Sequence, residues 1–153
     1  MNIRLKARII ILFIFFTTTL SIGQSLVLDV PVFGHSVGSK WCWASVTQMA
    51  TYYYGNDTEL CEIVEWARLN NYISVGNNNC CTYPTSCFGG ISSSYIDDVL
   101  GSENLSCAIV NDNVTLSTLQ STIDDYRPLI IGGCHNGILG HVMIVKGYDG
   151  SYI

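Results

Sequence analysis

Lys40-Trp41-Cys42-Trp43-Ala44-Ser45-Val46 opens a predicted helix from which the rest of the chain can be interpreted. After Trp43 apolar residues recur at spacings of three and four without proline, until Gly55-Asn56-Asp57 breaks the pattern. The expected inner face is formed by Val46, Met49, Ala50 and Tyr53. Cys42 would then lie at the amino end of the helix, where unpaired N–H groups and the helix dipole favour a thiolate and can bind a developing oxyanion.

A histidine 99 residues later is the natural partner for this cysteine. His141 follows Gly140 and precedes the apolar run Val142-Met143-Ile144-Val145, which predicts a strand. A cysteine attacks as the thiolate, and a histidine can pair with that thiolate and then donate its proton to the leaving group. Each motif alone is compatible with a structural role, because cysteine is often buried in cores. Together and in this order they predict a catalytic dyad.

On these residues the chain resembles the papain-like cysteine peptidase superfamily, in particular its short bacterial branches. These branches include secreted staphopain-like enzymes and the peptidases that trim double-glycine leaders. The resemblance runs from Val30 to the end and rests on four segments, which are Cys42–Gly55, Cys80–Gly90, Arg127–Ile130 and Gly140–Asp149. It implies a two-lobed domain with the active site between the lobes. It also implies peptide-bond hydrolysis through an acyl-enzyme, with Cys42 as nucleophile and His141 as general base and acid.

The chain departs from the family pattern at two places. The family has a glutamine about six residues before the nucleophile, whose amide completes the oxyanion hole, but Ser36 stands here, preceded by His35. Ser36, His35 and the backbone N–H of Cys42 are the candidate donors. The family also places an asparagine or aspartate after the histidine, whereas Asp149 is the only later carboxylate and is interpreted as a turn residue. We therefore expect the domain to be incomplete at its C-terminus.

The remaining pattern predicts an α+β domain with helices first and strands last. Asp57 or Thr58 is the expected cap of a second helix that runs to Leu69 and buries Leu60, Ile63, Val64 and Ala67. Residues 70–90 are expected to form a cysteine-stapled loop. Further helices are expected at 94–100 and 116–125, and a strand at 129–131. The helical lobe would carry Cys42, and an antiparallel sheet lobe would carry His141.

The amino terminus has the layout of a signal peptide. Three basic residues precede the apolar run Ile9–Phe16, and the small-residue site Ser21-Ile22-Gly23 follows. The predicted domains are thus residues 1–23 as signal peptide and 24–153 as the papain-like domain, exported to the periplasm or secreted. Three of the seven basic residues and none of the twelve acidic ones lie in residues 1–23, so the mature chain would carry a net charge of −8. Such a charge argues against nucleic acid or anionic membrane as partners.

Apart from Cys42, the chain has six cysteines, an even number that predicts disulfides in an exported protein. The candidates are Cys61, Cys80, Cys81, Cys87, Cys107 and Cys134. Adjacent Cys80 and Cys81 are expected to bond Cys61 and Cys87 in one order or the other, which leaves Cys107 and Cys134 to pair or stay free. A metal site formed by Cys80, Cys81, Cys87, Cys134 and His135 is the alternative, but it lacks paired C-x-x-C spacing.

Two tryptophans flank the nucleophile. Packing of the helix is the expected role of Trp43, whereas Trp41 is a candidate for lining the substrate cleft. His135 lies in the glycine-rich segment Gly132–Gly137 and is interpreted as a loop residue rather than as the base. The sequence thus predicts a secreted cysteine peptidase that acts on peptides or proteins and needs no cofactor or metal. The alternatives are an amidase or transglutaminase with the same dyad, or an inactive binding module with the same fold.

Overall fold

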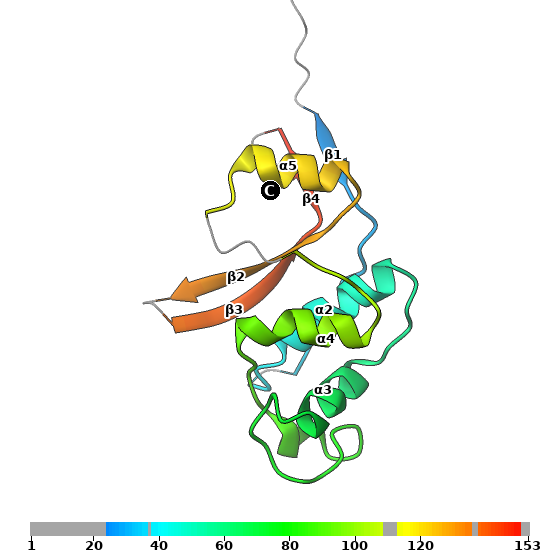
Figure 1. The fold of residues 1–153 in the computed structure, drawn as a ribbon, viewed down its shortest axis with the longest axis vertical. Coiled ribbons are helices and arrows are strands. Elements are labelled where there is room, and N and C mark those ends of the chain that lie inside the picture. The colour runs from blue at the N-terminus through cyan, green and yellow to red at the C-terminus, as the bar shows by residue number, and fades with distance from the viewer. Residues whose placement is uncertain (1–23, 37, 109–112, 136–137, 151–153) are drawn as a thin grey trace, which may run out of the picture.

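The computed structural model describes residues 24–36, 38–108, 113–135 and 138–150, and the expected signal peptide, residues 1–23, lies outside this part of the chain (Figure 1). The described residues form an α+β fold, which confirms the expected class. In chain order the elements are β1 (Ser25–Val27), α2 (Cys42–Tyr53), α3 (Leu60–Leu69), the 3-10 turns η1 (Pro84–Cys87) and η2 (Ser93–Tyr95), α4 (Ile96–Ser102), α5 (Leu116–Asp124), β2 (Leu129–His135), β3 (Ile138–Val145) and β4 (Gly147–Asp149).

The described strands form two antiparallel pairs. In the first pair β1 lies against β4, with Leu26 opposite Tyr148. In the second pair β2 lies against β3, with Ile130 opposite Ile144. Figure 1 shows the β2–β3 hairpin between two groups of elements, with α5 and the β1–β4 pair on one side and α2, α3 and α4 on the other.

Helix α2 is the central element, because every residue from Trp43 to Thr51 is buried. It packs against β3, α3 and α4. The buried hydroxyls of Thr47 and Thr51 donate to the carbonyls of Trp43 and Gln48, so neither is left unpaired inside the core. Gly55, at φ 91°, follows the helix in a left-handed conformation that suits its missing side chain. The expected inner face is therefore only part of what the helix buries.

Two hydrophobic clusters meet at α2. The first joins the amino half of α2 to α3, α4 and the cysteine-rich segment, and it includes Trp41, Trp43, Ile63, Cys87 and Val142. The second joins Met49 to α5 and the β1–β4 pair, and it includes Leu28, Ile123 and Tyr148. Ile144 of β3 packs against both clusters. Burial of these residues accounts for the close contact between α2 and β3.

The predicted cap of α3 was wrong. Glu59 occupies the N-cap, and it forms a reciprocal capping box with Glu62. Thr58 does not cap the helix, because its hydroxyl donates to a carboxylate oxygen of Glu103. The expected inner face of this helix is confirmed, since Ile63, Val64 and Ala67 are buried and Leu60 packs against the same cluster.

The strands differ most from the expectation. β2 continues past residue 131 to His135, so His135 belongs to a strand rather than to a glycine-rich turn, since pairing with β3 extends the ladder. The turn predicted at Asp149 is instead part of the strand β4, and β1, which the sequence did not indicate, pairs with this strand. Gly147 permits this pairing, because a Cβ there would lie 2.6 Å from the carbonyl oxygen of Leu26. Asp149 is consequently a strand residue.

Two disulfides staple the segment after α3. Cys61 bonds Cys81, and Cys80 bonds Cys87. The adjacent cysteines thus take different partners, as expected, and Cys107 is free and exposed. Three residues of the alternative metal site are held in these bonds, which favours the disulfide interpretation. In the part of the chain that the structure describes, no helix is long and apolar enough to cross a membrane.

The two disulfides differ in burial, and this difference predicts the order in which they are reduced. Cys80 and Cys87 are fully buried, whereas Cys81 is exposed and Cys61 is half-buried. Thiol–disulfide exchange requires access of a thiolate to sulfur. We expect mild reductant to open Cys61–Cys81 before Cys80–Cys87 in the native protein, as measured by timed alkylation and peptide mapping. Earlier alkylation of Cys80 and Cys87 would contradict this expectation.

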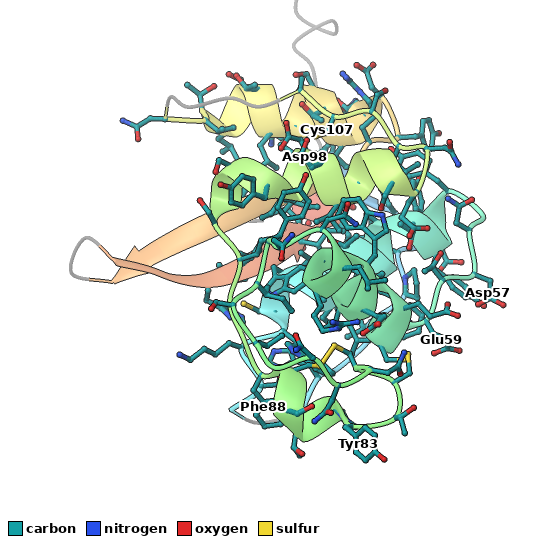
Figure 2. All side chains as sticks on the ribbon, turned by 60° about the horizontal axis from the view of Figure 1, so that its bottom comes forward. Asp57, Glu59, Tyr83, Phe88, Asp98 and Cys107 are labelled. Atoms are coloured by element: carbon teal, nitrogen blue, oxygen red, sulfur yellow. A yellow bond between two sulfur atoms is a disulfide. The ribbon has the colours of Figure 1, made fainter. Side chains whose placement is uncertain are left out.

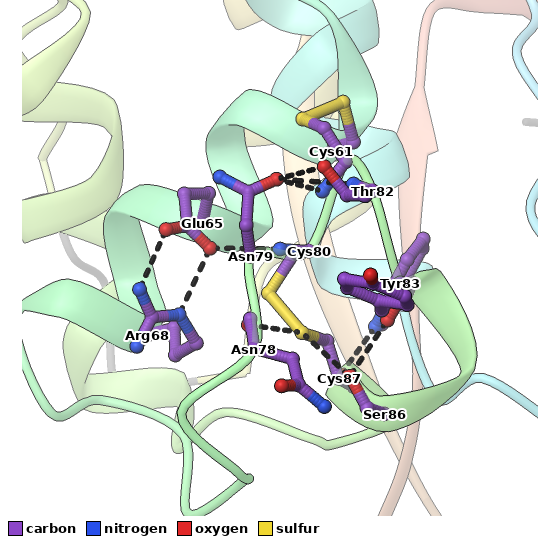
Figure 3. Close-up of a disulfide and its surroundings, with 12 residues drawn as sticks. Cys61, Glu65, Arg68, Asn78, Asn79, Cys80, Thr82, Tyr83, Ser86 and Cys87 are labelled. Carbon is purple, nitrogen blue, oxygen red and sulfur yellow. Dashed lines mark hydrogen bonds and ion pairs between the residues drawn. A yellow bond between two sulfur atoms is a disulfide. The ribbon is translucent and has the colours of Figure 1, made fainter.

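The carboxylate of Glu65 fastens the stapled segment to α3 (Figure 3). It accepts two hydrogen bonds from the guanidinium of Arg68, at 2.9 and 2.6 Å. The same carboxylate accepts the backbone N–H of Cys80 at 2.9 Å. The hydrogen bond from Arg68, followed by the bond from Cys80, lowers the pKa of Glu65 to about 2.

This shift predicts an acid-sensitive contribution to stability. Because the pKa of Glu65 is lower in the folded than in the unfolded chain, its ionised form stabilises the fold above about pH 4.5, and the effect is lost as the pH falls towards about 2. We expect Glu65→Gln to flatten the decline of unfolding free energy across this window in urea titrations. Asp125→Asn is the control. The side chains of Asp125 and Arg127 are 66% and 60% exposed, so their ion pair contributes little to stability. If both variants flattened the pH dependence of the unfolding free energy equally, this contribution could not be assigned to Glu65.

Candidate active site

Cys42 is the first residue of α2, as the sequence predicted. Its thiol is free and half-buried. No side chain in the described residues caps this end of the helix, since Trp41 at the N-cap position has no oxygen to offer, and the first turn contains no acidic residue. The N–H groups and positive dipole end therefore face the region of the thiol without competition from a carboxylate, which favours negative charge there.

His141 is the fourth residue of β3, so it lies within the strand rather than at its start. Its cross-strand partner is Gly133, and the next pair is Val142 with Gly132. Because glycine has no side chain, the β2 position directly opposite His141 presents no side chain to the imidazole. His141 is accordingly exposed and free to meet a substrate or a partner residue.

The structure brings the elements of the two residues together. α2 packs against β3, and Cys42 contacts the cluster that contains Val142, the neighbour of His141. Neither the thiol nor the imidazole is hydrogen-bonded to another residue in the described ranges. Asp149, the only later carboxylate, is exposed on β4 opposite Ser25.

A tight turn leads into α2, and it carries the two side chains considered for the oxyanion hole. Ser36 is exposed and His35 is partly exposed, and fully buried Ser39 holds the turn together. The Ser39 hydroxyl donates to the carbonyl of Ser36 at 2.7 Å and accepts the backbone N–H of Trp41 at 3.3 Å. Nδ1 of His35 lies 3.1 Å from both the Ser39 hydroxyl and the Ser36 carbonyl. The imidazole is thus two hydrogen bonds from the residue that precedes Cys42.

One tautomer of His35 satisfies these contacts together. The only hydrogen of the Ser39 hydroxyl is directed to the Ser36 carbonyl, and that carbonyl is itself an acceptor. In that tautomer Nδ1 is the donor to both oxygens. In a neutral imidazole Nε2 is then an acceptor, so His35 can donate through Nε2 only as the imidazolium.

Trp41 is only 4% exposed, so at most an edge of its ring can reach a bound substrate. The neighbouring aromatic residue is Phe88, which packs edge-on against Trp41 at a centroid distance of 5.8 Å and is 38% exposed. Figure 2 places Phe88 at the end of the molecule opposite Cys107, so the exposed free cysteine is remote from this aromatic pair. The side chains of Cys134 and His135 lie outside the described residues.

Sequence reasoning missed the contributions of Ser39 and Gly89. A serine shortly before a helix start is a common capping signal, and this signal could have directed attention to Ser39. Gly89 lies so close to Val75 that a Cβ at this glycine would be 3.2 Å from the Cγ1 of Val75. The carbonyl of Gly89 accepts the indole N–H of Trp43 at 3.1 Å. No local pattern marks this second contact.

A free cysteine at the amino end of a buried helix, packed against a strand that carries a histidine, is an arrangement typical of cysteine peptidases. The Peptidase_C39 like family model matches residues 27–153, and the chain therefore belongs to this family. Membership supports a relationship with C39 and papain-like peptidases and suggests cysteine peptidase activity on protein or peptide substrates. No curated protein and no solved structure matches the chain.

Proposed function

We propose that the protein hydrolyses peptide bonds with Cys42 as the nucleophile and His141 as the general base and acid. The observation that carries this proposal is the free, half-buried thiol of Cys42 at the first position of α2. The family relationship supports the same reaction class. In this arrangement the elements around α2 and α3 and those around the β2–β3 hairpin correspond to the two lobes of a papain-like fold.

The reaction follows from the proposed roles. The Cys42 thiolate attacks the carbonyl carbon of the scissile bond and forms a tetrahedral oxyanion. His141, as imidazolium, donates a proton to the leaving amine, the C–N bond breaks and a thioester remains on Cys42. Neutral His141 then takes a proton from water, the resulting nucleophile attacks the thioester, and the carboxylic product leaves with regeneration of the thiolate–imidazolium pair.

The backbone N–H of Cys42, at the helix start, can donate to the oxyanion whatever the protonation state of His35. His35 adds a second donor only when it is protonated, because its Nδ1–H is held by the turn. The exposed hydroxyl of Ser36 is the remaining candidate. We expect His35→Ala to lower kcat about tenfold or more with little change in KM, because it removes this donor. An unchanged kcat together with a lower free energy of unfolding would assign His35 a structural role.

We further propose that residues 1–23 are a signal peptide and that the mature protein acts outside the cytoplasm. The two disulfides are compatible with an extracellular or periplasmic location.

Labelling by a thiol-reactive epoxide across pH 4 to 9 tests the proposed function directly. The wild-type protein without residues 1–23 is compared with Cys42→Ala, and the adduct is mapped by mass spectrometry. The proposal requires preferential modification of Cys42 that persists well below the ordinary thiol pKa of about 8.5. Labelling of Cys107 in preference to Cys42 in the folded protein would overturn it.

A further inference from the structure

The geometry points to a second role for the segment that the disulfides staple. This inference rests on the proposed function. We propose that the segment closed by the Cys80–Cys87 disulfide positions the nucleophile, and that the indole N–H groups of Trp41 and Trp43 transmit this effect. These side chains are thus positioning residues rather than catalytic ones.

Both neighbours of Cys42 are anchored to the same short segment. The indole N–H of Trp41 donates to the carbonyl of Cys87 at 3.0 Å, and that of Trp43 donates to the carbonyl of Gly89 at 3.1 Å. Trp41 and Trp43 are 4% and 1% exposed. Because a buried carbonyl or N–H that loses its partner is costly, this pair of bonds strongly restricts the start of α2.

The accepting segment is itself rigidly held. Cys80 and Cys87 are fully buried and disulfide-bonded, and the N–H of Cys80 is held by Glu65 (Figure 3). Beyond Cys87, Gly89 lies so close to Val75 that a Cβ at this position would be 3.2 Å from the Cγ1 of Val75. A continuous series of contacts therefore leads from α3 through the disulfide to both sides of Cys42.

Position matters at this residue because the thiol must face both the N–H groups of the helix start and the substrate carbonyl. A misplacement of about 1 Å can reduce a rate about a hundredfold. Phe88 lies between the two accepting residues and packs on Trp41, so any shift of this segment also moves aromatic surface beside the nucleophile.

Trp41→Phe is the first test, because it removes the indole N–H and keeps an aromatic ring. Trp66→Phe is the matched control, since Trp66 packs on Tyr72 in the same cluster and its indole donates no hydrogen bond to a described residue. We expect Trp41→Phe to slow iodoacetamide modification of Cys42 about tenfold or more at about pH 6, with recovery at about pH 9.5, and to lower kcat with little change in KM. Trp66→Phe should leave the profile unchanged.

A comparison of the two disulfides provides a second test that does not depend on tryptophan. Cys80→Ala/Cys87→Ala should slow the modification of Cys42 at about pH 6, whereas Cys61→Ala/Cys81→Ala should not, although each variant loses one disulfide. Thermal unfolding of each variant establishes that it is folded. Equal labelling profiles in all folded variants would overturn the positioning role. Failure of the wild-type protein to label at Cys42 would instead refute the proposed function, so the two results are distinguishable.

Discussion

Cys42→Ala is expected to reduce hydrolysis of a peptide substrate by a factor on the order of 10⁴ or more, because no other group can form the thioester. The methyl group of alanine fits the half-buried position at the start of α2, so the variant should keep the fold and the stability of the wild type. Product formation is measured by mass spectrometry on a casein digest, with peptide substrates chosen from the cleavage sites that the wild type produces.

Cys107→Ala is the matched control for this experiment. Cys107 is also a free cysteine, but it is exposed and remote from Phe88, the residue that packs on Trp41 (Figure 2). Although the residue is exposed, partial desolvation of its thiol raises the pKa, and the charge of Asp97 adds to this effect. The control should therefore retain wild-type activity. Activity that survives Cys42→Ala and disappears with Cys107→Ala would contradict the assignment of the nucleophile.

His141→Ala is expected to lower kcat by about 10² to 10⁴ at neutral pH, because it removes both the base and the proton donor. Modification of Cys42 by a small alkylating reagent should fall strongly at about pH 6 and recover at about pH 9, where hydroxide ionises the thiol without help from an imidazole. Initial rates of alkylation across pH, mapped to Cys42, measure this change.

His135→Ala tests the alternative base on the same hairpin. His135 pairs with Ile138 at the far end of the β2–β3 ladder, whereas His141 pairs with Gly133 closer to the core. This variant should leave the pH profile of Cys42 modification unchanged. A larger loss for His135→Ala than for His141→Ala would reverse the two assignments, and equal small losses would show that neither histidine activates the thiol.

Helix positions were predictable where a local pattern was strong. The spacing of apolar residues and the break at Gly55 located α2, and the buried face of α3 followed from the same periodicity. The cap of α3 was not predictable, because Thr58 and Glu59 are both suitable neighbours of the helix start and the choice depended on Glu103, 45 residues away. Local propensity could not include that competition.

The strands were less predictable because their partners are distant. Gly132 and Gly133 indicated a turn, yet pairing with Val142 and His141 extends β2 through both glycines. β1 is three residues long and pairs with β4 across almost the whole chain. Short strands carry little periodicity, so only the partner reveals them.

The sequence by itself determined the helix that begins at Cys42, the apolar faces of α2 and α3, and the rule that Cys80 and Cys81 take different partners, since these depend on neighbouring residues. Only the tertiary structure decided that Cys81 bonds Cys61, that Nδ1 of His35 lies against the Ser39 hydroxyl, and that the tryptophans beside Cys42 donate to carbonyls at and just beyond Cys87. The physical reason is that hydrogen bonds and disulfides require particular distances and directions, and these are set by how residues remote in the chain pack together.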